Sequence, residues 1–523
     1  MYDILIRGAQ VIDGTGAPAF CADVAVKDGK LVMNPEGEAT EVIDAAGLTL
    51  CPGFIDAHSH GDSILGTEAG QLCKTSQGVT TELAGLCGTT YYPFSTDPEK
   101  RDMLLKKLGR DIHDAQERTC LEHYLPWVNA QPKTANIALY IGHGSVRISV
   151  MGFALRTPTA EELESMKGMV REAMEHGAMG MSSGLIYAPS CYANEDELVE
   201  LCKVVAEYGG TYATHMRSEA NEVVESVREA IRVAERAGCK LNISHHKIAG
   251  RDNWGRSVQT LELIHEARAR GVDVTLDAYP YTASSTGLNA CLPSDFFSHG
   301  PDKMYQLLAD PAVRAQLKPR MSGMDSRLRH CGGWGGILVT VAPKTPAAVN
   351  KTVLDYAAEI NADPFDAYFD LMTNNGGAAK AIYFTMSEED LQRIVCDENT
   401  VIGSDGVVRA LNIPSHPRGF GTFTKAIRYF VRDKGLLTLE QMIHKMTGLT
   451  AQRFGLATKG VIADGMDADL LLFRPDEIRD HATYQNGLAL SEGIERVIVA
   501  GQTVYQNGRL TGTCPGVFLP HRG

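Results

Sequence analysis

The sequence has no long hydrophobic run. Nowhere in its 523 residues does an apolar stretch approach the ~20 residues that a membrane-spanning helix needs. Residues 1–8 also lack the basic stretch and the following apolar stretch of a secretory signal peptide. We therefore expect a cytoplasmic protein with no membrane partner.

Positive charge and regularly spaced cysteines are scarce as well. Lys and Arg number 50 against 64 Asp and Glu, which gives a formal net charge of −14. Nucleic-acid binding needs clustered basic residues to meet the phosphates, so this balance argues against such a partner. The 12 cysteines form no CxxC pair and no disulfide framework, which indicates reduced thiols. The expected partner is a small-molecule substrate, and the oligomeric state stays open.

The two ends of the chain have the same kind of sequence pattern. Residues 1–50 and 455–523 are both rich in short apolar strands separated by tight turns, such as the Asp28-Gly29 hairpin signal. Helical periodicity is poor in both segments. We predict that the two ends together form one small β-sandwich domain.

Residues 51–454 instead alternate short apolar strands with helical segments. Apolar residues recur at helical spacing in Thr159–His176, Glu195–Tyr208, Ala220–Ala237 and Val258–Arg270. Eight strands are predicted to end near His58, Cys87, His143, Ser183, His215, His245, Tyr279 and Asp405. This alternation favours an α/β fold, a (β/α)8 or TIM barrel. The last two strands are far apart, so we expect an inserted subdomain at about residues 294–343.

Residues of metal-ligand type gather at the predicted strand ends, where such barrels carry their active sites. They are His58, His60, Cys87, His215, His245 and Asp405. Imidazole, thiolate and carboxylate groups are ligands for Zn²⁺. The spacing of His58 and His60 directs both imidazoles to one side of an extended chain. Any single histidine or cysteine is more ordinary as a surface or core residue, but their joint placement at strand ends indicates a metal site.

Several motifs in chain order resemble one known family. The segment Pro52-Gly-Phe-Ile-Asp-Ala-His-Ser-His is similar to the first-strand signature of the amidohydrolase superfamily. Further segments resemble its D-aminoacylase branch, the N-acyl-D-amino-acid deacylases. They are Gly78-Val-Thr-Thr-Glu-Leu-Ala-Gly-Leu-Cys-Gly, Gly177-Ala-Met-Gly-Met-Ser-Ser-Gly-Leu-Ile-Tyr-Ala-Pro, Thr214-His-Met-Arg-Ser-Glu, Ile243-Ser-His-His-Lys, Tyr279-Pro-Tyr-Thr-Ala-Ser-Ser-Thr, Gly403-Ser-Asp-Gly and His416-Pro-Arg-Gly-Phe-Gly-Thr-Phe. The resemblance covers almost the whole chain and weakens in the predicted insertion.

This resemblance implies a zinc-dependent hydrolase of N-acyl-D-amino acids. It implies a tightly held Zn²⁺ on Cys87, His215 and His245. A second, weaker position would be lined by His58, His60 and Asp405, with Cys87 able to bridge.

Related hydantoinases and dihydroorotases bridge their metals with a carbamylated lysine from the fourth strand. Residues 176–184 contain no lysine. Cys87 is the natural substitute, which favours the D-aminoacylase branch.

The resemblance also implies roles in catalysis and substrate binding. Asp405 is expected to take a proton from the attacking water and deliver it to the leaving amine. From the local sequence alone, Asp405 could equally be a turn residue, because Ser404-Asp405-Gly406 has residue types that are common in turns.

Substrate-binding residues are expected around this site. By the resemblance, Lys247 and Arg418 handle the substrate carboxylate, with Tyr187, Tyr281 and Ser284 nearby. These last three residues are equally well explained by packing at the barrel rim.

Two other functions stay open. The chain is alternatively a hydrolase of a cyclic amide or imide, although the missing fourth-strand lysine counts against this. A catalytically silent scaffold protein is a third interpretation. It is disfavoured because every metal-ligand position of the family holds a residue able to bind a metal. The segment Asp277–His299 contains no Lys or Arg, so we also predict that the enzyme prefers neutral or apolar substrate side chains.

Overall fold

Parallel strands occupy the middle of the chain in the computed structural model, which describes residues 1–522. Their hydrogen bonds form two runs in chain order, β6-β7-β8 and β9-β10-β11-β12-β13-β17. All neighbours in both runs pair in the parallel sense. The strands are β6 (Phe54–Asp56), β7 (Val79–Ala84), β8 (Asn136–Leu139), β9 (Ile141–Gly142), β10 (Gly180–Gly184), β11 (Thr211–His215), β12 (Lys240–Ile243), β13 (Val274–Ala278) and β17 (Thr400–Ile402).

Short links bring the two runs together. Only Tyr140 separates β8 from β9 along the chain. At the opposite edges, the amide of Ala57 donates to the carbonyl of Ile402 with an N···O distance of 3.2 Å. The amide of Asp405 likewise donates to the carbonyl of His58 at 2.7 Å. The first and last parallel strands therefore lie side by side, as the predicted (β/α)8 arrangement requires.

Helices follow the parallel strands along the chain. Those predicted from periodicity are confirmed as α5 (Ala160–Glu175), α6 (Glu195–Glu207), α7 (Val223–Ala237) and α8 (Ser257–Ala269). Thr159 begins α5 with a reciprocal capping box to Glu162, which satisfies two backbone amides at the helix start. Outside the segment between β13 and β17 up to residue 384, the other α-helices are α1 (Glu68–Thr75), α2 (Pro98–Leu108), α3 (Leu121–Ala130), α4 (His143–Met151), α14 (Glu388–Cys396), α15 (Arg418–Lys425), α16 (Leu439–Met446) and α17 (Gly448–Phe454).

Strands from both ends of the chain pair with each other. β5 (Thr49–Pro52) lies antiparallel to β18 (Leu470–Phe473), and this pair joins the N-terminal to the C-terminal strands. The remaining strands are β1 (Tyr2–Val11), β2 (Phe20–Lys27), β3 (Lys30–Met33), β4 (Ala39–Asp44), β19 (Ile494–Val499), β20 (Gln502–Gln506) and β21 (Arg509–Leu510). Strands from both ends of the chain therefore belong to one nine-stranded hydrogen-bonded sheet. That they form a β-sandwich domain stays a prediction.

The segment between β13 and β17 forms a separate layer. β14 (Ala283–Gly287) and β15 (Ile337–Val341) both pair antiparallel with β16 (Lys380–Phe384). The helices beside them are α9 (Pro301–Leu307), α10 (Pro311–Met321), α11 (Arg327–His330), α12 (Val353–Glu359) and α13 (Pro364–Asn375). Their apolar core reaches from Leu288 to Tyr383 and is therefore wider than the predicted 294–343.

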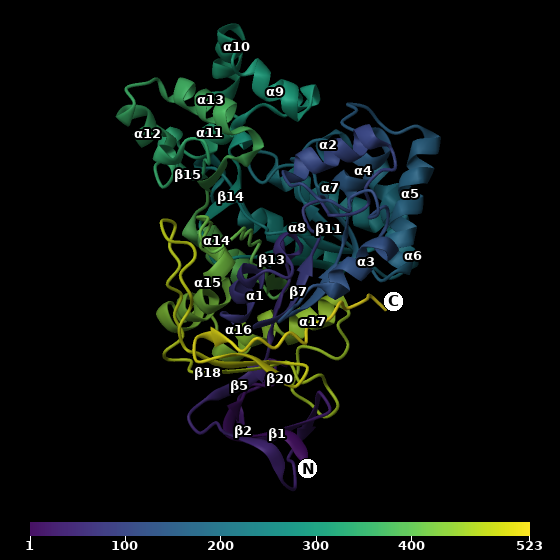
Figure 1. Cartoon of the computed structure of the whole chain (residues 1–523), viewed down its shortest axis with the longest axis vertical. Coiled ribbons are helices and arrows are strands. Elements are labelled where there is room, and N and C mark those ends of the chain that lie inside the picture. Colours follow the sequence, from purple (N-terminus) through teal and green to yellow (C-terminus); the bar gives the residue numbers. More distant parts are fainter. Residues whose placement is uncertain (523) are drawn as a thin grey trace.

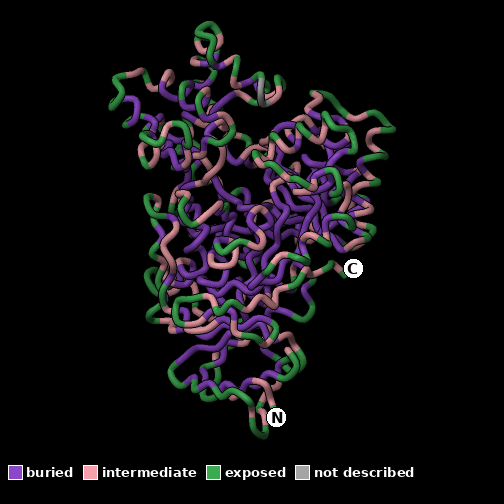
Figure 2. The backbone as a smooth tube through the Cα atoms, viewed as in Figure 1, coloured by how far each residue is buried: buried purple, intermediate pink, exposed green. Residues whose placement is uncertain are grey.

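The three parts stack along the long axis of the molecule. Figure 1 shows the nine-stranded sheet at one end, the parallel strands in the middle and α9–α13 at the other end. Buried residues concentrate around the parallel strands (Figure 2). None of the helices in the described part of the chain combines the length and apolar character needed to cross a membrane.

Candidate metal centre

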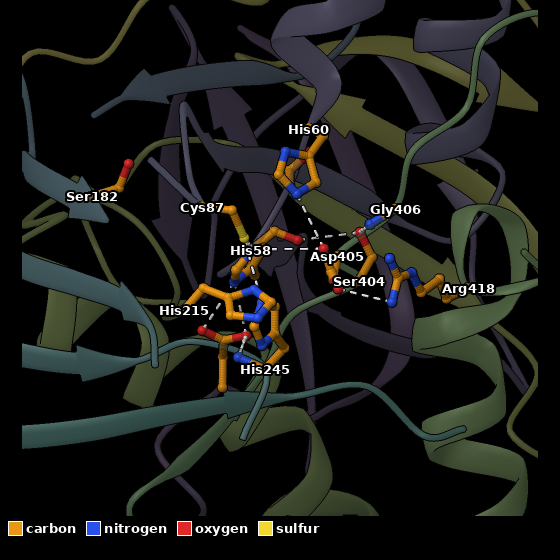
Figure 3. A network of polar contacts seen from close by, with 12 residues as sticks. His58, His60, Cys87, Ser182, His215, His245, Ser404, Asp405, Gly406 and Arg418 are labelled. Carbon is orange, nitrogen blue, oxygen red and sulfur yellow. Dashed lines mark hydrogen bonds and ion pairs between the residues drawn. The ribbon is translucent and has the colours of Figure 1, made fainter. Parts of the chain in front are cut away.

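The six predicted ligands all lie at the carboxyl ends of parallel strands. His58 and His60 follow β6, Cys87 follows β7, and His215 is the last residue of β11. His245 follows β12 and Asp405 follows β17. Figure 3 shows their side chains converging on one region, with Arg418 beside Asp405. The strand ends thus bring together residues that are far apart in the sequence.

Cys87 lies at the centre of the cluster. Its Sγ is 3.4 Å from Nε2 of His58 and 3.3 Å from Nε2 of His245. Oδ1 of Asp405 lies 3.7 Å from His58 Nε2 and 3.1 Å from His60 Nε2. Ligand atoms of His58, Cys87, His245 and Asp405 all lie within 4.8 Å of one another. This spacing allows one cation to contact several of them at once.

The ring nitrogens of His215 also suit a metal ligand. Its ring is buried, and neither Nδ1 nor Nε2 has a hydrogen-bond partner. Buried polar atoms are normally hydrogen-bonded, because leaving them unpaired costs free energy. Together with Glu219 and His245 it forms a second group of ligand-type atoms. The donor set of imidazoles, thiolate and carboxylate therefore fits a Zn²⁺ ion.

Neighbouring groups in the cluster favour the deprotonated, negatively charged forms of Cys87 and Asp405. Burial raises the pKa of the Cys87 thiol, but His58 and His245 outweigh it and hold that pKa well below its usual range. For Asp405, burial again raises the pKa, and Arg418 and the nearby histidines lower it well below the usual range. Both side chains thus present negative charge to a cation.

The backbone turns sharply at three of these residues. Cys87, His245 and Asp405 have φ angles of 56°, 37° and 47°. This left-handed region is uncommon for residues other than glycine and is strained for most side chains. The strain is retained where it aims a side chain from a strand end into the cluster.

Two carboxylates that sequence reasoning missed orient the ligands. Asp277 on β13 lies 3.1 Å from Nδ1 of His58 and accepts a hydrogen bond of 2.8 Å from the amide of His245. Glu219 lies 3.1 Å from Nδ1 of His245. Partners of this kind fix the ring orientation of ligand histidines. Both positions carried a signal, since Asp277 lies two residues before the predicted strand end at Tyr279 and Glu219 ends the motif that begins at Thr214.

The two predicted carboxylate-binding cations already have anionic neighbours. Lys247 donates to Glu219 and lies 2.8 Å from Nδ1 of His245. Nη1 of Arg418 lies 2.8 Å from Oδ2 of Asp405. That contact is not aligned as a hydrogen bond, and Nε and Nη1 of Arg418 are buried without an acceptor. Arg418 therefore keeps unused donors beside the cluster.

Among the predicted tyrosines, Tyr187 lies at the cluster and Tyr281 does not. The Tyr187 ring is 5.1 Å from the ring of His215. Tyr281 instead packs on His416 at 5.2 Å, and its hydroxyl donates to the carbonyl of Pro417. Tyr279 lies close to the two cations: Nζ of Lys247 and the guanidinium carbon of Arg418 are 5.7 and 4.8 Å from its ring centroid, and its buried hydroxyl has no hydrogen-bond partner.

A cavity of about 500 Å³ opens beside the cluster. Glu219 and Lys247 line it beside the ligand histidines, and the rest of the wall comes from other loops after the parallel strands, such as that of Arg217, and from the inserted layer. The predicted Ser284, on β14, is one of the lining residues. A site of this size accommodates a small molecule.

Residues 41–505 match the model of the amidohydrolase family. The chain belongs to this family. This amidohydrolase is 35% identical to a D-aminoacylase of Alcaligenes xylosoxydans xylosoxydans, over 99% of the chain and 97% of the relative. It is 34% identical to an N-acyl-D-glutamate deacylase of the same organism, over 96% of the chain and 93% of the relative. The resemblance found in the motifs is confirmed.

A solved structure extends the likeness to three dimensions. It is N-acyl-D-glutamate deacylase from Bordetella bronchiseptica, complexed with zinc and a phosphonate inhibitor that mimics the tetrahedral intermediate. The TM-score is 0.84 with 33% identity, and the match covers 100% of each chain.

Proposed function

We propose that this amidohydrolase uses zinc to hydrolyse the amide bond of N-acyl-D-amino acids, releasing a carboxylate and a free D-amino acid. The observation that carries the proposal is the cluster of His58, Cys87, His245 and Asp405, whose ligand atoms lie within 4.8 Å beside the cations Arg418 and Lys247. The near-full-length relatives support the same reaction and the D configuration.

In this proposal one zinc ion is held tightly and a second more weakly. Cys87, His215 and His245 would hold the tight ion, because they combine a thiolate with two buried imidazoles. His58, His60 and Asp405 would line the second position, with Cys87 between the two. Zinc bound here supplies Lewis-acid polarisation of the scissile carbonyl and of the attacking water.

The side chains of the protein then orient the substrate and move the proton. Arg418, with its unused donors, binds the α-carboxylate of the substrate together with Lys247 and the hydroxyl of Tyr279. Asp405 accepts a proton from water and passes it to the leaving nitrogen. The carboxylate contact and the carbonyl contact fix two points of the substrate, and a side-chain pocket fixes the third. Three fixed points distinguish mirror images.

We also infer that the parallel strands close into a (β/α)8 barrel within residues 51–454. Hydrogen bonds between the ends of β6 and β17, and the continuity of β8 and β9, support this closure. The sheet of residues 1–50 and 455–523 would form a second domain. The inserted layer at 283–384 would form the cover of the active site.

A paired substrate panel tests the function. N-acetyl-D-methionine and N-acetyl-D-glutamate are compared with their L forms, their D-configured α-methyl esters and a hydantoin. We expect hydrolysis of at least one free D acid, with little of its L form or ester. Equal rates for a D acid, its L form and its ester would contradict both the carboxylate contact and the stereochemistry. Hydrolysis of the hydantoin alone would favour a cyclic-amide hydrolase.

A further inference from the structure

The cavity beside the metal-ligand cluster has one cation without an anionic partner. Arg327, at the start of α11, lines the cavity together with Lys247 and Ser284. Its side chain is half-buried, and among residues whose side chains the structure describes no carboxylate lies within ion-pair distance of it. Its guanidinium carbon lies 5.1 Å from the centroid of the Tyr383 ring.

The other cations of the cavity wall are already paired. Nη2 of Arg217 lies 2.8 Å from Glu229, and Nη2 of Arg320 lies 2.5 Å from Asp295 at the exposed rim. Lys247 donates a hydrogen bond to Glu219. A half-buried cation without a counter-charge is costly, because it has lost part of its hydration with no compensating partner. An anionic group of a ligand would supply that partner.

The position of Arg327 indicates which part of a substrate it would meet. Lys247 lines the same cavity and contacts the ligand His245, so one part of the cavity wall lies next to the cluster. Arg418 lies near Lys247, since both are close to the ring of Tyr279, at 4.8 and 5.7 Å from its centroid. A substrate whose α-carboxylate is held by Lys247 and Arg418 has its side chain free to extend into the cavity toward Arg327.

We propose that the substrate of this enzyme carries an acidic side chain, and that Arg327 binds the side-chain carboxylate. This inference rests on the proposed hydrolysis of N-acyl-D-amino acids. It replaces the expectation of neutral substrates, which considered only the basic residues within Asp277–His299. Arg327 lies beyond that segment, yet the fold returns it to the same cavity. Overall identity does not decide the point, because the D-aminoacylase and the N-acyl-D-glutamate deacylase are 35% and 34% identical to the chain.

The first test uses the unaltered holoenzyme and isosteric substrate pairs. kcat/KM is measured for N-acetyl-D-glutamate against N-acetyl-D-glutamine, and for N-acetyl-D-aspartate against N-acetyl-D-asparagine. We expect one acid to exceed its amide by about 100-fold, as for a desolvated charge pair at a binding site. Equal rates within both pairs, or faster hydrolysis of both amides, would overturn the role of Arg327. Absence of hydrolysis for every D substrate would instead overturn the proposed function.

The second test assigns the preference to one residue. In R327M, the ratio of kcat/KM for the acid to that for its amide should fall by about 100-fold. The matched control is R320M, which removes an arginine from the same cavity wall where Asp295 already neutralises it. That control should retain the ratio. An unchanged ratio in R327M with normal zinc content, or an equal fall in R320M, would contradict the assignment.

Discussion

The carboxylate of Asp277 lies 3.1 Å from Nδ1 of His58. This contact leaves Nε2 of His58 facing Cys87 and Asp405. The same carboxylate accepts a hydrogen bond from the backbone amide of His245, so one buried group positions two ligands that follow different strands, β6 and β12. Orienting partners of this kind raise metal affinity by holding the ligand rings in place.

Asp277→Asn should therefore weaken zinc binding while leaving all six ligands in the chain. We expect an affinity loss of about 10–100-fold, measured by competition with a chelator. Asp273→Asn is the control, because Asp273 pairs with Arg268 and Arg453 away from the cluster. Unchanged affinity in the Asp277 variant would show that the contact does not orient His58.

Cys87→Ala should lose tightly bound zinc and activity together. A methyl group cannot replace the thiolate that lies between His58 and His245. Cys396→Ala removes a half-buried thiol at the end of α14 and should keep both properties. The zinc content of both variants is measured by mass spectrometry of the native protein, together with their rate of hydrolysis of a D substrate. Retention of both in Cys87→Ala would exclude the proposed centre.

Asp405→Asn should separate proton transfer from metal binding. The amide keeps the shape of the side chain but accepts no proton, so kcat should fall by ~10²–10⁴. Tight zinc should largely remain, since Cys87, His215 and His245 are unchanged. Steady-state kinetics on a protein of known zinc content measures this. Turnover close to that of the unaltered enzyme would remove Asp405 from the proton pathway.

Lys74→Met should destabilise the strand that carries His58 and His60. Nζ of Lys74 lies 2.6 Å from Asp56 and 3.3 Å from Glu82, and all three side chains are buried. Burial lowers the pKa of Lys74, but the two carboxylates outweigh it and raise that pKa above the usual range. Removing the cation leaves buried negative charge, at a cost of about 3–5 kcal/mol in the free energy of unfolding.

Denaturant unfolding measures that loss. The control is Lys100→Met, whose partner Asp97 is 3.8 Å away on the surface. It should change the free energy of unfolding by less than ~0.5 kcal/mol. Equal effects of the two substitutions would show that the buried cluster contributes no more than a surface pair.

Much of the site was predictable because barrel topology converts a one-dimensional pattern into a cluster. Residues such as His58, Cys87 and Asp405 follow apolar strands, and parallel strands end at one face. The position of Tyr279 beside Lys247 and Arg418 was not predictable, because Tyr279 and Tyr281 both follow β13 in a loop whose path sets which ring lies near these cations.

The inserted layer was less predictable for a different reason. β14 has the sequence Ala-Ser-Ser-Thr-Gly, which lacks the apolar alternation of a strand and is held by pairing with β16. The predicted boundaries of the inserted layer, 294–343, were therefore too narrow. Arg327 lies on the four-residue helix α11, far from any strand-end motif. Its position at the cavity depends on tertiary packing that no local pattern encodes.

Zinc titration of the metal-free enzyme shows whether zinc is needed for hydrolysis of N-acyl-D-amino acids. Zinc is removed with a chelator, and the rates on N-acetyl-D-glutamate, N-acetyl-D-methionine and their L forms are measured as zinc is returned. We expect negligible activity without zinc and hydrolysis of a D form that rises as the first equivalent per chain binds, with little hydrolysis of the L forms. Activity that is independent of zinc, or that rises equally for both enantiomers, would contradict the proposed function.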